Sequence, residues 1–128
     1  MSEKKILVVD DDEGILSLMK QIFTRAGYNV VLAENAEKAL EILERENIYV
    51  FFLNINLPGM NGLELCREIR KNMPMAIIHA VTGYASLFEL SDSRDAGFDD
   101  YFNKPVKLSL LLKAAENAFE KHERWKKK

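Results

Sequence analysis

Short apolar runs alternate with amphipathic stretches along the whole chain. Segments of strand length, rich in β-branched and aromatic residues, cover residues 6–9, 28–33, 49–54, 76–81 and 98–103, and those at 6–9 and 49–53 are wholly apolar. Runs of this kind that end in turn or polar residues are typical of strands buried on both faces of a sheet. The pattern therefore predicts five short strands.

Helical spacing of apolar residues follows each predicted strand. The first helix ends at Gly27, Asn35 is a plausible N-cap of the second, and Pro74 ends the third. The fourth, within residues 84–96, is the least regular, whereas the last runs from Leu108 to about Trp125. Strand then helix, five times over without a linker, predicts an α/β fold with a parallel sheet covered on both faces. We expect one domain over residues 1–128, with a core of about 4–121 and a helical extension and basic tail over 122–128.

Composition agrees with a single soluble domain. The 128 residues are 48% hydrophobic and 30% charged, with a net charge of −2, which argues against a general grip on nucleic acid. No apolar run approaches the roughly 20 residues of a membrane span, and the first residues lack the apolar core of a signal peptide. Cys66 is the only cysteine, so a reducing compartment and a cytoplasmic location are expected.

Polar side chains stand where four of the predicted strands end: acids at 10–12, Asn54, Thr82 and Lys104. The carboxyl ends of parallel strands form one edge, where ligands bind in such folds. Each residue also has an ordinary explanation, since acids favour helix N-termini and Asn favours turns. Because four strand ends carry such groups at the same edge, the pattern favours a ligand-binding site over four separate ordinary explanations. His79 and Cys66, by contrast, suit a hydrogen-bonded core histidine and a packing residue.

With these segments in view, the sequence resembles the receiver domain of two-component response regulators over nearly its whole length. The matching segments are Val8-Val9-Asp10-Asp11, residues 54–62 (Asn-Ile-Asn-Leu-Pro-Gly-Met-Asn-Gly), Thr82-Gly83 and Tyr101-Phe102-Asn103-Lys104-Pro105. Each is weak alone, but all in order are specific. The resemblance implies a flavodoxin-like (βα)5 fold, doubly wound, with strand order 2-1-3-4-5. It also implies a phosphorelay in which a sensor histidine kinase or phosphotransfer protein donates a phosphoryl group with Mg²⁺ bound.

The resemblance also implies a role for each site residue. Asp11 matches a direct ligand of Mg²⁺, Asp10 a ligand through water, and the backbone carbonyl of Asn56 a further ligand. Two more residues, Thr82 and Lys104, match the hydroxyl and ammonium that bind phosphoryl oxygens, and Tyr101 matches an aromatic switch on the partner-binding face. Oxygen ligands suit Mg²⁺, and the ammonium and hydroxyl suit charge on a phosphoryl group.

The departure from the family lies at Asn54, where the family places its phosphoacceptor aspartate. A neutral amide is not a competent nucleophile for this step, and an acyl phosphate cannot form on it. The loss of one negative charge should also weaken Mg²⁺ binding. The sequence does not distinguish a natural pseudo-receiver from an Asp-to-Asn variant.

We therefore expect a receiver that acts by protein–protein contact and is not an enzyme. No DNA-binding region follows Lys128, although the chain could be a fragment of a longer regulator. The effector surface is expected over residues 84–127, with homodimerisation left open and with no direct contact to nucleic acid or membrane.

One rival is a haloacid-dehalogenase-like, Mg²⁺-dependent phosphatase that uses Asp10 and Asp12. Another is a flavodoxin-type FMN binder, which the absence of a glycine-rich phosphate loop after Val9 disfavours.

Overall fold

The computed structural model describes residues 4–83 and 87–126. Within them, five strands alternate with five helices, as the apolar runs predict. The elements in chain order are β1 (Lys5–Val9), α1 (Glu13–Arg25), β2 (Asn29–Ala33), α2 (Ala36–Leu43), β3 (Val50–Asn54), α3 (Gly62–Asn72), β4 (Ile77–Thr82), α4 (Leu87–Ala96), β5 (Asp100–Asn103) and α5 (Leu108–Lys126).

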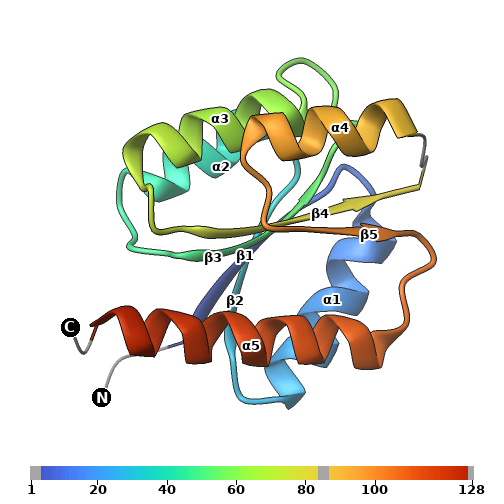
Figure 1. Ribbon diagram of the computed structural model, residues 1–128. Helices are drawn as coiled ribbons and strands as arrows, with labels where there is room; N and C mark the ends of the chain where they lie inside the picture. The colour runs from blue at the N-terminus through green and yellow to red at the C-terminus, as the bar shows by residue number, and fades with distance from the viewer. Residues whose placement is uncertain (1–3, 84–86, 127–128) are drawn as a thin grey trace.

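The strands form one parallel sheet in the order β2-β1-β3-β4-β5. Helices α2, α3 and α4 cover one face of the sheet, and α1 and α5 cover the other (Figure 1). This is the doubly wound, flavodoxin-like architecture that the family resemblance implies. Among the described residues, no helix combines the length and apolar character needed to cross a membrane.

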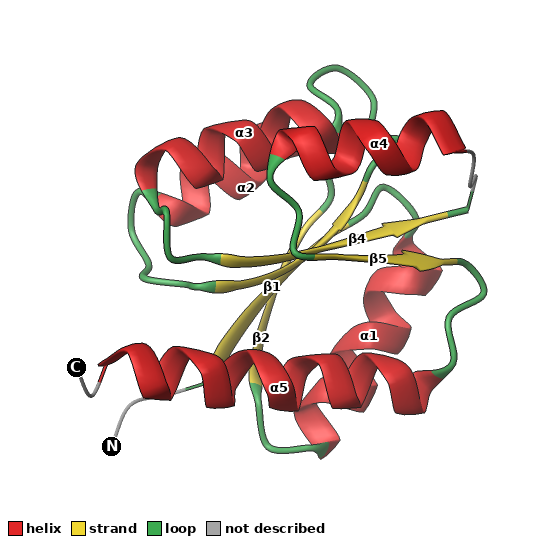
Figure 2. Ribbon diagram, viewed as in Figure 1, coloured by secondary structure: helices red, strands yellow, loops and turns green. Residues whose placement is uncertain are grey.

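The central strand β3 is buried on both faces, and Figure 2 shows it running between the two helical layers. Phe51 and Leu53 pack into the core beneath α2 and α3, whereas Val50 and Phe52 pack toward α1 and α5. Successive side chains of a strand point to opposite faces, so the apolar residues 50–53 fill both cores at once. Asn54 is the last residue of this strand, and its position is therefore fixed by the most buried element of the fold.

Most element boundaries follow the sequence signals. The Asn35 side chain accepts a hydrogen bond from the backbone N–H of Lys38 (2.7 Å) and caps α2, as predicted. Helix α3 ends at Asn72, two residues before Pro74. The predicted fifth strand is wrong at its start, since β5 begins at Asp100 rather than at residue 98.

Two features account for this later start. Gly97 has φ +104°, which turns the chain sharply after α4. The backbone N–H of Ile78 in β4 then donates to the Asp99 carboxylate (2.7 Å) rather than to a ladder carbonyl. The Asp99 backbone N–H donates in return to the Ile78 carbonyl (2.7 Å), so a side chain supplies one of the two hydrogen bonds that join Ile78 to Asp99.

The least regular of the predicted helices is present as α4, and α5 extends to Lys126, including the predicted extension through Trp125. Residues 84–86, which open the segment predicted as irregular, lie outside the described residues. Trp125 is 52% exposed, so it lies on the surface near the end of α5.

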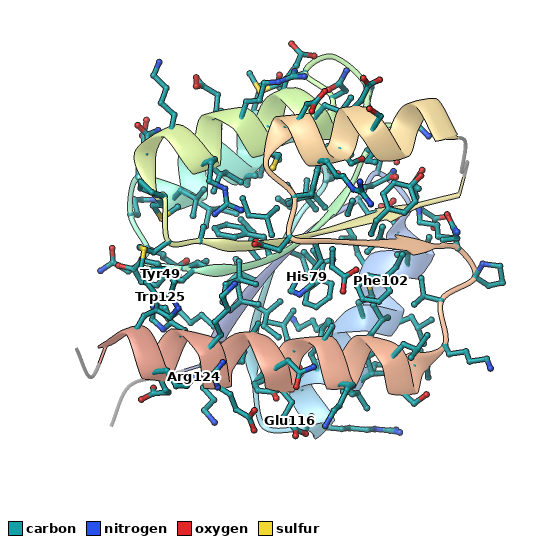
Figure 3. All side chains as sticks on the ribbon, viewed as in Figure 1. Tyr49, His79, Phe102, Glu116, Arg124 and Trp125 are labelled. Atoms are coloured by element: carbon teal, nitrogen blue, oxygen red, sulfur yellow. The ribbon has the colours of Figure 1, made fainter. Side chains whose placement is uncertain are left out.

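His79 and Cys66 are core residues, as predicted. His79 is 4% exposed, stacks on Phe52 at a centroid distance of 4.2 Å, and its Nδ1 lies 2.8 Å from the Phe51 carbonyl oxygen. Figure 3 shows His79 beside Phe102, between the sheet and α5. Burial lowers the pKa of His79, against the opposing effect of the hydrogen bond to Phe51. Burial likewise raises the pKa of the Cys66 thiol to about 12.

The neutral, buried His79 gives a pH-dependent stability. The unfolded chain takes up this proton near pH 6.5, whereas the folded chain resists it, so the unfolded state binds more protons as the pH falls below about 6.5. Stability is therefore lost on acidification, by up to about 1.4 kcal/mol per pH unit within that window. Urea unfolding at pH 7.5 and 5.5 should show a larger loss for the parent than for His79→Gln, which keeps a hydrogen-bond donor but does not titrate. Equal losses in the two proteins would contradict the assignment.

Candidate functional site

The polar residues at the strand ends lie at one edge of the sheet. Asp10 follows β1, Asn54 ends β3, Thr82 ends β4 and Lys104 follows β5. The Asp10 side chain contacts those of Asn54 and Lys104, and the Lys104 backbone N–H donates to the Thr82 carbonyl (2.7 Å). The structure therefore brings together the residues that the sequence predicts to meet, while what they bind stays a prediction.

Asp10 is the most enclosed acid of the group, with 2% of its surface exposed. Its Oδ2 lies 2.9 Å from the Lys104 ammonium, and its Oδ1 accepts the backbone N–H of Asp12 (2.9 Å). A buried carboxylate requires such partners, because an unpaired charge away from water is costly. Lys104 is thereby held at the pocket although it lies 94 positions from Asp10.

The Asn54 side chain is the centre of a second set of contacts. Its Nδ2 lies 3.5 Å from Asp10 Oδ1, 3.2 Å from Asp11 Oδ1 and 3.2 Å from the Asn56 backbone carbonyl oxygen. Asn54 itself is only 6% exposed. One amide nitrogen thus faces the three oxygen groups that the resemblance implies as cation ligands.

Asp11 and Asp12 have different surroundings from Asp10. Both are exposed. Asp12 is the N-cap of α1, and its Oδ1 accepts the backbone N–H groups of Gly14 (2.8 Å) and Ile15 (3.3 Å). Of the three consecutive aspartates, Asp10 and Asp11 therefore face Asn54, and Asp12 caps the helix.

The donor set suits a hard cation. Two carboxylates and a carbonyl converge within 3.5 Å of a single point, the Asn54 nitrogen, and Mg²⁺ prefers such oxygen ligands. Among the described residues, no group of three or more His, Cys, Asp or Glu side chains is arranged to hold a metal ion. These oxygen groups fit Mg²⁺ by their chemistry. Only two of them are acidic, however, and all three already contact the Asn54 amide.

The loop after β3 positions Asn54 and the Asn56 carbonyl. Gly62 N–H donates to the Ile55 carbonyl (2.8 Å), closing the loop, and Asn61 and Glu64 form a capping box at the start of α3. In the sequence, Asn61 and Gly62 stand out only as part of the segment 54–62 that carries the family resemblance. The spacing Asn61-x-x-Glu64 is a readable signal for the cap, although none marks how closely Gly62 approaches β3.

Two hollows flank the site, and no sequence signal pointed to the second. The first is lined by loop residues that include Asp11, Asn56, Asn61 and Asp92. The second is mainly apolar and is lined by Ile15, Leu18, Met19, Lys104, Val106 and Leu108, among others. Leu18 and Leu108 are 46% and 40% exposed. Apolar surface is thus exposed directly beside the site's ammonium.

Tyr101 lies on β5, paired with Ala80 of β4 and three residues before Lys104. Its side chain is half-buried, and its backbone N–H donates to the Asp100 carboxylate (2.9 Å). The residue therefore lies on the edge strand, two positions before Asn103, which is the register partner of Thr82. Its switch role stays a prediction.

Comparison with known proteins identifies the family to which the chain belongs. The family model described as response regulator receiver domain matches residues 6–116. A response regulator receiver domain protein (CheY-like) from Methanospirillum hungatei JF-1 is 40% identical, with a TM-score of 0.88 over 96% of this chain and 99% of that one.

Curated relatives agree, and each is much longer than this chain. A protein named cyclic di-GMP phosphodiesterase from Thermotoga maritima is 38% identical over 106 residues, which are 83% of this chain and 28% of that protein. The alkaline phosphatase synthesis transcriptional regulatory protein PhoP of Bacillus subtilis is 37% identical over 102 residues, which are 80% of this chain and 42% of that protein. The chain thus spans less than half the length of these two relatives.

The dehalogenase-like phosphatase alternative finds no support. It required Asp12 as an acid/base, whereas Asp12 is committed to the N-terminus of α1. The family match covers both acids within a receiver domain.

Gly62 provides a test of how the loop holds the site. A Cβ at this position would lie 2.3 Å from the Asn54 carbonyl oxygen and 2.7 Å from Ile55 Cα, both backbone atoms that cannot move cheaply. Gly62→Ala should therefore lower the free energy of unfolding by about 1–3 kcal/mol or more. Gly83→Ala is the control, because its Cβ would make an ordinary 3.7 Å contact with Lys104 Cδ. Equal urea midpoints for the two variants would refute the close approach.

Proposed function

This chain belongs to the response regulator receiver domain family, and we propose that with Asn54 it is a receiver that cannot be phosphorylated at the usual acceptor position. The observation that carries the proposal is the amide at the end of β3, which faces Asp10 and Asp11, with Lys104 paired to Asp10. A carboxylate there would offer an anionic oxygen to a phosphorylated donor. The amide carries no negative charge. It also has no carboxylate oxygen that could attack phosphorus and form an acyl phosphate.

The remaining groups fit phosphoryl chemistry. Asp10, Asp11 and the Asn56 carbonyl would hold Mg²⁺, which when bound neutralises the charge that builds up on phosphoryl oxygens. The ammonium of Lys104 is fixed at the pocket by Asp10, and Thr82 ends the neighbouring strand. These two would receive the phosphoryl oxygens. Binding of Mg²⁺ to the Asn54 form should be weak.

Receiver domains are signalling modules, and for these residues we propose signalling by contact rather than an enzymatic activity. The phosphoryl donor would be a sensor histidine kinase or phosphotransfer protein, and exposed Leu18 and Leu108 beside Lys104 support a protein partner at this edge. The effector surface is proposed over about 84–127, with Tyr101 as the switch and with no direct contact to nucleic acid or membrane. A cytoplasmic location follows from such partners and is part of the proposal.

Restoring the carboxylate tests the proposal. Asn54→Asp should convert the chain into a phosphorylatable receiver in one step, because Asp and Asn are nearly isosteric and the other groups are in place. With acetyl phosphate and Mg²⁺, intact-mass spectrometry should show one added phosphoryl group that hydroxylamine removes. The parent should gain none.

The controls separate the parts of the site. Chelating the metal, or combining Asp11→Ala with Asn54→Asp, should abolish labelling. If the parent labels as well as the variant, the acceptor lies elsewhere. If neither labels although both are folded, the site has lost more than its nucleophile.

A further inference from the structure

The Asn54 amide nitrogen has more acceptors than it has hydrogens. Its two N–H groups face Asp10 Oδ1, Asp11 Oδ1 and the Asn56 carbonyl at 3.5, 3.2 and 3.2 Å. Two of these acceptors are carboxylates, and such charge-assisted bonds are stronger than neutral ones. The nitrogen therefore sits at the meeting point of the oxygen groups assigned to the cation.

We propose that the Asn54 amide acts as a built-in substitute for the cation, so that it competes with Mg²⁺ for the same oxygens. The inference rests on the proposed function, whose metal ligands it uses, and it adds a second effect of the residue. Loss of a negative charge removes attraction for the metal. A donor pointed at the ligands must, in addition, be displaced before the metal can bind.

The orientation of the amide follows from its neighbours. If the side chain were turned about its last bond, Asn54 Oδ1 would face two carboxylates and a carbonyl, all of them acceptors, without a hydrogen between them. Asn54 is 6% exposed and Asp10 is 2% exposed, so water has little access to relieve such a contact. The nitrogen-inward orientation is the one that these groups stabilise.

The competition also explains how two acids tolerate one another at this edge. Lys104 neutralises Asp10 from one side at 2.9 Å, and the Asn54 amide bridges Asp10, Asp11 and Asn56 from the other. A cation would do the same bridging with a stronger field. Metal binding thus requires the Asn54 side chain to rotate away and give up its hydrogen bonds.

Asn54→Ala separates the two effects of the residue. If Asn54 only lacks a charge, the alanine variant is no better than the parent, because it also lacks the amide oxygen that could ligate the metal. If the amide competes, removing it frees the oxygens, and Mg²⁺ should bind about tenfold more tightly than to the parent, the factor that corresponds to one or two modest hydrogen bonds. Asn54→Asp should bind most tightly of all.

The experiment is a Mg²⁺ titration of the whole chain, followed by calorimetry, with folding of each variant checked by circular dichroism. The affinities should increase in the order parent, Asn54→Ala, Asn54→Asp, while Asn117→Ala, at an exposed position of α5, should match the parent. Asn54→Val, which also lacks a donor and suits a strand, makes the same comparison if the alanine variant does not fold.

Two results would overturn the inference. One leaves the proposed function intact, and the other contradicts it as well. If Asn54→Ala binds no more tightly than the parent while Asn54→Asp does, the amide does not compete, and the proposed receiver site stands. If Asn54→Asp also fails to bind Mg²⁺, the oxygens do not form a metal site, and the inference falls together with the proposed function.

Discussion

The central constraint is the placement of a buried carboxylate at the edge of a parallel sheet. Asp10 is 2% exposed and can be tolerated there because Lys104, the Asp12 backbone N–H and the Asn54 amide all face it. These partners come from β3, from the start of α1 and from the loop after β5. The sheet order therefore matters to function, since β1 and β3 must be neighbours for Asn54 to reach Asp10.

The same constraint explains what an amide at position 54 changes and what it preserves. The amide keeps the shape of an aspartate, so β3 and the loop closed by Gly62 need not move. It reverses the local chemistry, however, since a donor stands where the family has an anionic acceptor. The pocket thereby gains an internal bridge between its oxygens and loses its nucleophile.

Much of the fold could be predicted from the sequence, because strands buried on both faces leave continuous apolar runs such as 50–53. The strand order came from the family resemblance and not from the runs. Long-range polar contacts were beyond reach: nothing in the periodicity pairs Lys104 with Asp10, or Arg70 with Asp99 (2.9 Å) at the other end of the sheet. The start of β5 was missed because the Ile78 N–H donates to the Asp99 side chain, although the Asp99 backbone N–H donates to the Ile78 carbonyl.

The site was predictable as a set of residues but not as an arrangement. Strand-end positions indicated that Asp10, Asn54, Thr82 and Lys104 would meet. The direction of the Asn54 amide depends on three acceptors brought together only by folding, one of them the Asn56 backbone carbonyl, which only the family resemblance indicated. The role of Tyr101 rests on the resemblance and stays a prediction.

The most direct test of this account is the side-chain amide resonance of Asn54 in ¹⁵N-labelled protein, identified by its loss in Asn54→Ala. When a chelator keeps Mg²⁺ away, the hydrogen-bonded Nδ2 protons of Asn54 should be protected from exchange with water, unlike those of exposed Asn117. Mg²⁺ should remove that protection with the same midpoint as metal binding. An Asn54 amide that exchanges as freely as Asn117 in chelator, or that stays protected when the metal has bound, would contradict it.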